Sequence, residues 1–120
     1  MMSNMRVTKE VVLDCSRAEA WELLTDPGEL AAWLGRPVDF ELNIVDDHRV
    51  GFEWSDEGRE LTNVEFVVEE VEGGTRLTVT ETAVRASVAG GVRRLPIGAN
   101  WDDRLLDLEL LCVTRAAVRV

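Results

Sequence analysis

The sequence predicts an α+β fold in which a curved antiparallel β-sheet wraps around a long C-terminal α-helix, with two short helices after the first strand. Several segments between residues 6 and 81 alternate apolar and polar side chains, which is typical of strands with one buried face. Short turns rich in Gly and Asp separate the later strands, so neighbouring strands run antiparallel. Residues 99–118 carry apolar side chains at helical spacing and are long enough to cover such a sheet.

The predicted sheet has five strands. The first covers Arg6–Asp14, where Val7, Val11 and Leu13 share one face and Lys9 falls in the same phase. The other four strands follow the short helices as a meander, and alternation assigns their inward side chains. These are Val38, Phe40, Leu42 and Ile44; Val50, Phe52 and Trp54; Val64, Phe66 and Val68; and Leu77, Val79 and Glu81.

Two short helices are predicted between the first and second strands. Ser16 and Glu19 have the spacing of a capping box, which begins the first helix. Asp26 followed by Pro27 begins the second, and Gly35 ends it in a left-handed cap. The inward side chains are predicted to be Ala18, Trp21 and Leu24 in the first helix and Leu30, Trp33 and Leu34 in the second.

Two apolar stripes run along the C-terminal helix, about 130° apart at about 100° per residue. One consists of Trp101, Leu105, Leu108, Cys112 and Ala116, and the other of Leu106, Leu110, Val113 and Ala117. The sheet covers only one stripe, so the second must meet another element. Two alternatives are open: the same stripe of a second subunit, in a symmetric homodimer through Leu106, Leu110 and Val113, or the two short helices of the same chain.

Composition indicates one domain over residues 1–120, in the cytoplasm, with reduced thiols. The sequence has no run of apolar residues long enough to cross a bilayer and no signal-peptide pattern. The net charge of −10 argues against nucleic acids and anionic membranes as partners. Residues 1–84 hold nineteen acidic and seven basic side chains, whereas residues 85–120 hold four and six. Scattered charge of this kind is typical of a solvated surface.

Few side chains suit catalysis or metal binding. His48 is the single histidine, which excludes histidine-based triads and multi-histidine metal centres. Cys15 and Cys112 have no CxxC context or neighbouring histidine, so inert thiols are expected, with Cys112 packed in the core. Gly90–Gly91 does not match a phosphate-binding loop. No metal and no cofactor are therefore expected.

Glu81 is the carboxylate of most interest, because strict alternation directs it into the interior. A buried carboxylate either finds a partner or rises in pKa, and both are common at functional sites. Lys9, Arg85 and Arg104 are the candidate partners. The alternative is a structural ion pair at the rim of the sheet, with no function.

Several segments carry a resemblance to a known family. Val11–Leu13 with Ser16–Asp26 looks like its first strand and helix, Leu30–Gly35 like its second helix, and Thr62–Phe66 with Glu70–Thr80 like its late hairpin. The chain thus resembles the START-like (SRPBCC) superfamily of polyketide cyclases and birch-pollen-allergen-like proteins, which have the helix-grip fold. Within it, the chain is most similar to the branch of the activator of the heat-shock-protein-90 ATPase. The resemblance covers roughly residues 6–84 and, less specifically, the terminal helix around Trp101.

The resemblance implies an apolar cavity between sheet and terminal helix that holds a hydrophobic small molecule such as a lipid, sterol or polyketide. The candidate pocket residues are Trp21, Trp33, Phe40, Phe52, Trp54, Phe66, Glu81, Trp101, Leu105 and Leu108. The four Trp side chains serve core packing equally well. Residues 85–98 form the candidate entrance loop, where Arg85, Arg93 and Arg94 could bind an anionic group.

Three functions follow from these observations. The first is non-catalytic binding of a hydrophobic small molecule. The alternative is a protein-interaction or co-chaperone module, by resemblance to the chaperone ATPase activator. The third is an enzyme of the cyclase or aromatase kind, with Glu81 as general acid or base.

Overall fold

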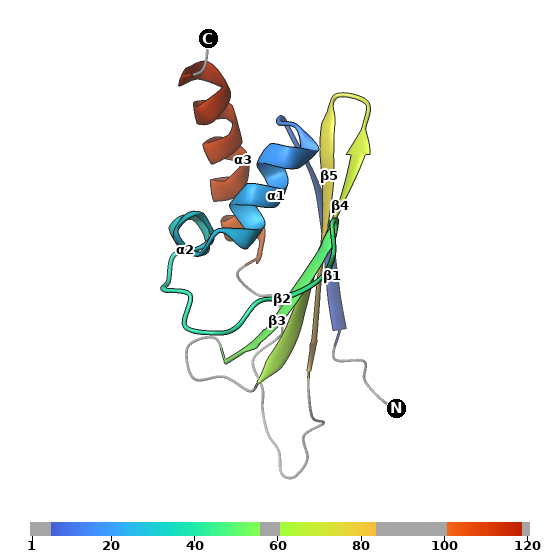
Figure 1. The fold of residues 1–120 in the computed structure, drawn as a ribbon, viewed down its shortest axis with the longest axis vertical. Helices are drawn as coiled ribbons and strands as arrows, with labels where there is room; N and C mark the ends of the chain where they lie inside the picture. The colour runs from blue at the N-terminus through green and yellow to red at the C-terminus, as the bar shows by residue number, and fades with distance from the viewer. Residues whose placement is uncertain (1–5, 56–60, 84–100, 119–120) are drawn as a thin grey trace.

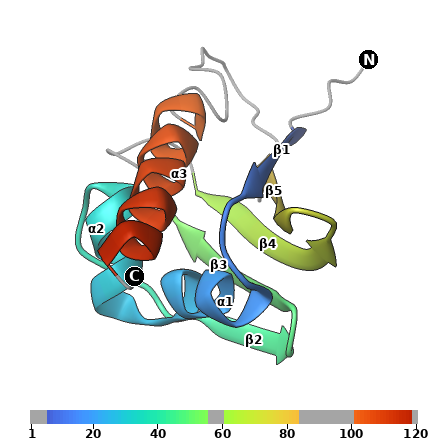
Figure 2. The same ribbon diagram turned by 90° about the horizontal axis from the view of Figure 1, so that it is seen from above.

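The computed structural model describes residues 6–55, 61–83 and 101–118, which form an open five-stranded antiparallel sheet and three helices (Figure 1). Seen from above, the helices lie on one side of the sheet (Figure 2). The elements in chain order are β1 (Arg6–Leu13), α1 (Arg17–Thr25), α2 (Pro27–Leu34), β2 (Asn43–Asp46), β3 (Arg49–Trp54), β4 (Thr62–Val71), β5 (Gly74–Ala83) and α3 (Trp101–Val118).

The strand order is β1-β5-β4-β3-β2, and every neighbouring pair is antiparallel. The predicted meander is therefore confirmed, and β1 completes the sheet beside β5. The tight β4–β5 turn depends on glycine: Gly73 has φ +91° and Gly74 has φ +152°. A Cβ on Gly74 would lie 2.1 Å from the carbonyl oxygen of Leu13, so the turn also needs the small residue for space.

The predicted strand from Val38 to Ile44 is wrong in its extent. Strand β2 covers only Asn43–Asp46, and Ile44 points to solvent with 55% of its surface exposed. Val38, Phe40 and Leu42 nonetheless pack against the core, from the segment that crosses from α2 to the sheet. Alternation reports which side chains are buried, and a crossing segment can bury alternate side chains without forming ladder hydrogen bonds.

The ends of the short helices are as predicted. Ser16 Oγ accepts a hydrogen bond from the backbone N–H of Glu19 at 3.1 Å, and Asp26 Oδ2 accepts from the N–H of Glu29 at 3.0 Å. Gly35 caps α2 with φ +79°. Leu30, Trp33 and Leu34 are buried, as the α2 pattern predicts.

The inward face of α1 differs from the prediction. Leu24 is buried as predicted, but Ala18 is exposed and Trp21 only partly buried, and Ala20 and Leu23 complete the buried face instead. The reason is that α1 packs against α2 as well as against β4 and β5, so its buried face is set by two neighbours. The wheel of an isolated helix does not contain that information.

The two stripes of α3 have different environments. Trp101, Leu105, Leu108 and Cys112 are buried against the rest of the domain, as predicted. In the second stripe, the exposed fractions of Leu106, Leu110 and Val113 are 52%, 56% and 51%. The alternative that the two short helices bury this stripe is therefore wrong. Residues 99–100 and the side chains of Ala116 and Ala117 lie outside the described part of the chain.

Helix α2 meets α3 through other contacts. Arg115 of α3 forms an ion pair with Glu29 of α2, and Arg104 Nε donates to the carbonyl oxygen of Leu34 at 3.2 Å. Near the start of α3, Asp102 pairs with Lys9 of β1 at 3.3 Å. These polar contacts hold α3 between α2 and the sheet edge.

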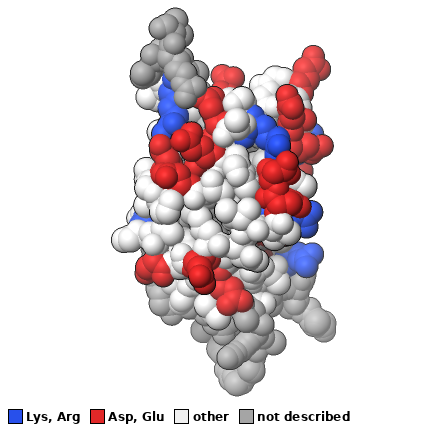
Figure 3. Space-filling model, in the orientation of Figure 1, with Lys and Arg blue, Asp and Glu red and all other residues white. Residues whose placement is uncertain are grey.

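The surface is mainly acidic. Figure 3 shows carboxylate side chains around a broad uncharged area on one face of the molecule. Of the helices in the described ranges, none combines the length and the apolar character that crossing a bilayer requires.

Candidate binding site

Glu81 lies on the inner face of the sheet, with 5% of its surface exposed. In the strand register it stands opposite Val7 of β1 and Val64 of β4. Leu77 and Val79 precede it on the same buried face. The sequence therefore predicted its direction correctly, and the structure places a carboxylate where the pattern of β5 calls for an apolar side chain.

Three donors satisfy this carboxylate. Trp101 Nε1 donates to Oε1 at 2.8 Å, whereas Trp54 Nε1 and Thr62 Oγ1 donate to Oε2 at 3.1 and 2.6 Å. An indole N–H can donate but cannot accept, so both tryptophans require an acceptor at this position. Hydrogen bonds to a charged acceptor are short and strong, which offsets the desolvation of a buried carboxylate.

The strand register explains why these side chains meet. Trp54, the last residue of β3, pairs with Thr62, the first residue of β4, and both point inward. Trp101 is the first residue of α3. Glu81 lies two residues before the end of β5, so all four groups gather where β3 and β5 end and where β4 and α3 begin.

Two guanidinium groups lie over the tryptophan rings at this end. The Cζ atoms of Arg36 and Arg104 are 5.0 and 5.1 Å from the Trp54 ring centroid, and Arg104 is 5.6 Å from that of Trp101. Cations at this distance are attracted to the face of an indole. The guanidinium groups of Arg36 and Arg104 therefore lie against the same Trp54 ring whose N–H donates to the Glu81 carboxylate.

The aromatic candidates form a continuous cluster beside Glu81. Phe66 is at its centre, with ring centroids 5.7 Å from Trp33, 5.6 Å from Phe52 and 6.0 Å from Trp101. Phe40 stacks on Phe52 at 4.3 Å. Leu105 and Leu108 of α3 belong to the same core, and Trp21 packs at its edge. The predicted pocket residues are thus brought together, and six of the aromatic rings, all except that of Trp21, are linked by ring contacts: Trp33, Phe40, Phe52, Trp54, Phe66 and Trp101.

The candidate cations have other roles. Lys9 pairs with Asp102, and Arg104 contacts the indoles and Leu34 as described above. Arg85, Arg93 and Arg94 lie outside the described residues. Within the described ranges, the partners of Glu81 are therefore two indoles and a hydroxyl, which the sequence analysis missed. Alternation places both Trp54 and Thr62 on the inner face, at the ends of two neighbouring strands, and this pattern could have predicted them as partners of Glu81.

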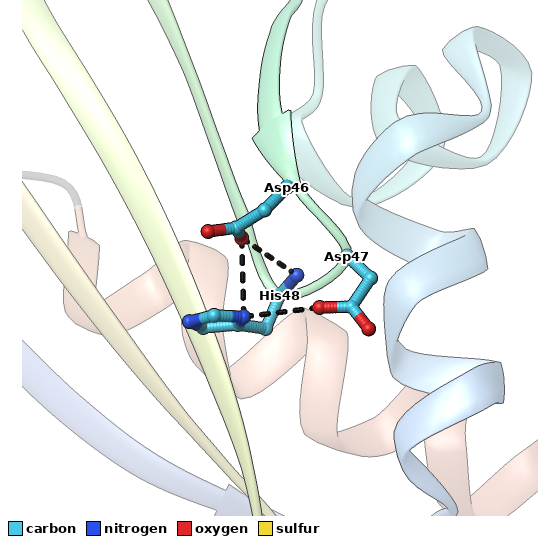
Figure 4. Close-up of side chains that lie close together, drawn as sticks. All are labelled: Asp46, Asp47 and His48. Atoms are coloured by element: carbon cyan, nitrogen blue, oxygen red, sulfur yellow. Dashed lines mark hydrogen bonds and ion pairs between the residues drawn. The ribbon is translucent and has the colours of Figure 1, made fainter.

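His48 lies in the β2–β3 turn between two aspartates (Figure 4). Its Nδ1 is 3.1 Å from Asp46 Oδ1 and 3.2 Å from Asp47 Oδ1, and its backbone N–H donates to Asp46 Oδ1 at 3.1 Å. The pKa of Asp47 is lowered, first by its hydrogen bond with His48 and then by Arg17. In the described part of the chain, these three residues are the one group whose potential metal ligands lie within 4.8 Å of one another. The hydrogen bonds and ion pairs among these three residues stabilise the turn, and this structural role explains why they lie together.

The two cysteines, 97 residues apart, lie side by side with Sγ atoms 3.3 Å apart. Cys15 is half-buried in the β1–α1 connection, and Cys112 is buried in α3. The Cys112 hydrogen bond lowers the pKa of Cys15, against the opposing effects of partial burial, Glu19 and Asp14. The same hydrogen bond and burial raise the pKa of Cys112. Nothing in the local sequence around either cysteine indicates this contact.

The fold defines the class: an open antiparallel sheet with a C-terminal helix packed on one face is a helix-grip fold. No protein-family model matches the sequence, and no curated protein does. Among solved structures, the chain is similar to protein MLL2253 from Mesorhizobium loti (20% identity over 88% of this chain and 95% of that one, TM-score 0.71).

Two further solved structures share the fold. DynU16, from the dynemicin biosynthetic locus, is 22% identical over 90% of this chain and 47% of its own length, with TM-score 0.68. The Aha1 dimer from Colwellia psychrerythraea is 16% identical over 89% of this chain and 95% of that one, with TM-score 0.64. At these identities the likeness establishes the fold and leaves the activity to be argued from the site.

Proposed function

We propose that this domain is a START-like binding protein that holds a hydrophobic, ring-containing small molecule between the sheet and α3. The observation that carries the proposal is the buried carboxylate of Glu81, held by Trp54, Thr62 and Trp101 at one end of an aromatic interior. Ligand sites are mostly apolar, with a small number of fixed polar groups that orient the ligand. The fold shared with DynU16, a protein of a biosynthetic locus, agrees with a small-molecule role.

The chemistry of the site suggests which ligands would fit. Glu81 can only accept hydrogen bonds as a carboxylate, so the ligand should carry a hydroxyl or amine that replaces one of the present donors. Its apolar part would displace or separate rings such as Trp54 and Trp101, which stack at 5.9 Å. A flat aromatic alcohol therefore represents the proposed ligand class.

A binding role fits this site better than catalysis. Among the described residues, Glu81 is the one buried ionisable carboxylate, and the single histidine lies in the β2–β3 turn. General acid–base catalysis usually needs a proton donor and acceptor placed against the substrate. A cyclase-like reaction with Glu81 as lone acid or base remains the less favoured alternative.

The first test is native mass spectrometry of the protein purified from its own host, with a denaturing spectrum alongside. Extra mass that disappears on denaturation is the expected result and would report the ligand class. A second test titrates tryptophan fluorescence with 2-naphthol and with naphthalene, which lacks the hydroxyl. We expect 2-naphthol to bind about tenfold more tightly, because it alone can donate to Glu81.

The variant Glu81→Leu, which has no acceptor, should lose that preference, whereas the exposed control Glu53→Gln should keep it. Near-ultraviolet circular dichroism of both variants checks that the aromatic core is intact. A protein without adduct that binds the two probes equally would contradict the proposal.

A specific observation also supports a homodimer. Leu106, Leu110 and Val113 form an exposed apolar stripe on α3, and the same fold occurs in a dimer, that of Aha1 from Colwellia psychrerythraea. We propose that two copies pack these stripes against each other around a two-fold axis. A co-chaperone role like that of the heat-shock-protein-90 ATPase activator is the alternative use of this surface.

Sedimentation of the parent chain and of Leu110→Arg tests the dimer. The parent should sediment as a dimer at high micromolar concentration, and Leu110→Arg as a folded monomer. Asp107→Arg is the matched control, because Asp107 is exposed on the same helix and outside the stripe. A parent chain that remains monomeric would overturn the homodimer.

A further inference from the structure

The two thiols are placed as a pair that can be cross-linked. Cys15 Sγ and Cys112 Sγ are 3.3 Å apart, and a disulfide bond measures about 2.05 Å, so closure requires a sulfur movement of about 1.3 Å. The backbone of Cys15 is held in place, because Thr75 Oγ1 donates to its carbonyl oxygen at 2.9 Å. The pair is therefore brought together by the fold, from positions at opposite ends of the chain.

The two cysteines differ in access. Cys15 is half-buried and reachable from solvent, whereas Cys112 has 1% of its surface exposed. They also differ in proton affinity, since the shared hydrogen bond lowers the pKa of Cys15 and raises that of Cys112. Arg115 acts in the same direction on Cys15. The thiolate is the nucleophilic form, so Cys15 is the thiol that reacts first.

We propose that Cys15 and Cys112 form a redox-active pair in which a hydroperoxide oxidises Cys15 and Cys112 resolves the product into an intramolecular disulfide. The Cys15 thiolate attacks one oxygen of hydrogen peroxide. An S–O bond forms, the O–O bond breaks, and hydroxide leaves, so Cys15 becomes a sulfenic acid. Cys112 then attacks the Cys15 sulfur: the S–S bond forms, the S–O bond breaks, and hydroxide takes up the Cys112 proton as water. The two sulfurs supply the two electrons that reduce the peroxide.

The disulfide would fasten α3 to the start of α1. Cys112 is the last buried residue of the inner α3 stripe in the described range, and Cys15 directly precedes the Ser16 N-cap. Cross-linking them closes a loop of nearly the whole domain, and long loops give large stabilisation. This inference is independent of the proposed ligand.

The test treats the reduced protein with equimolar hydrogen peroxide, then denatures it, alkylates it with iodoacetamide and measures the intact mass. We expect the loss of two hydrogen atoms, no alkyl groups and a peptide that links Cys15 to Cys112. The Tm should rise by about 10 °C and return on addition of dithiothreitol. Full alkylation of both cysteines after peroxide, or a disulfide between two chains, would overturn the proposal.

Two single variants separate the roles. Cys112→Ala should stop at a Cys15 sulfenic acid, which dimedone captures, whereas Cys15→Ala should leave Cys112 unmodified by the same peroxide. Faster oxidation of Cys112 than of Cys15 would contradict the assigned order. Peptide mapping of the parent protein decides on the disulfide itself, even if a variant at the buried Cys112 fails to fold.

Discussion

Trp54 and Trp101 stack with ring centroids 5.9 Å apart and direct their N–H groups to different oxygens of the same carboxylate, that of Glu81. One tryptophan ends β3 and the other begins α3. Glu81 thus joins sheet and helix through hydrogen bonds as well as through ring contacts.

Replacing Glu81 should destabilise the protein. In Glu81→Gln the amide keeps one acceptor oxygen but turns an NH2 group toward donors, so at least one buried donor is left without a partner. We expect a loss of about 1–3 kcal/mol in the free energy of unfolding. Urea unfolding followed by tryptophan fluorescence measures it. Glu53→Gln, exposed on β3, should change stability by less than about 0.5 kcal/mol, and an equal effect of both would contradict the role of Glu81.

Alanine at two glycines should have opposite effects. In Gly74→Ala the new Cβ would meet the backbone oxygen of Leu13 at 2.1 Å, so we expect a loss of more than about 2 kcal/mol. In Gly28→Ala the nearest atom is Asp26 Oδ2 at 3.4 Å, and the position lies in α2. Alanine should therefore stabilise there by about 0.5 kcal/mol. Thermal unfolding of both variants checks the sign, and a neutral Gly74→Ala would be inconsistent with this turn.

Asp26 links the two short helices, because it ends α1 and caps α2. Asp26→Ala removes the acceptor for the N–H of Glu29, and we expect a loss of about 1 kcal/mol. Chemical denaturation measures the change. Glu22→Ala, on the exposed side of α1, is the control and should be close to neutral; the prediction fails if the two variants lose equal stability.

The Cys15 thiol should react at lower pH than an ordinary cysteine. Its pKa is lowered, chiefly because Cys112 hydrogen-bonds to it, and the thiolate is the reactive form. The rate of alkylation by iodoacetamide should therefore reach half its maximum at lower pH than it does for a free cysteine. In Cys112→Ala the hydrogen bond is lost, and this midpoint should move to higher pH. An unchanged midpoint would show that Cys112 does not set the pKa of Cys15.

Much of the fold could be predicted because it depends on local patterns. The caps at Ser16, Asp26 and Gly35 and the inward phases of β3, β4 and β5 are properties of a few neighbouring residues each. The predicted extent of β2 was wrong because the sequence shows which side chains are apolar but not which backbone groups form hydrogen bonds with the next strand. The predicted inward face of α1 was right for Leu24 but wrong for Ala18, because two packing neighbours, rather than one, determine the buried face.

The site was only half predictable for the same reason. Alternation fixed the direction of Glu81, but the identity of its donors depends on where Trp101 of α3 meets the sheet. The Cys15–Cys112 contact depends on the opposite end of the same helix. A single sequence carries no local signal for pairs so far apart along the chain. Lys9 and Arg104 were reasonable partners by charge, and packing assigns them elsewhere.

The position of Trp101 has a consequence for the order in which the domain assembles. Before α3 docks, Glu81 has only the donors of the sheet, and the aromatic inner face is open to water. Docking of α3 supplies the third donor, Trp101, and at the same time buries apolar side chains of that face. The hydrogen bond and the burial therefore form together. The sheet is therefore expected to be unstable as an isolated hairpin array. Refolding should then occur in one cooperative step that waits for the last helix.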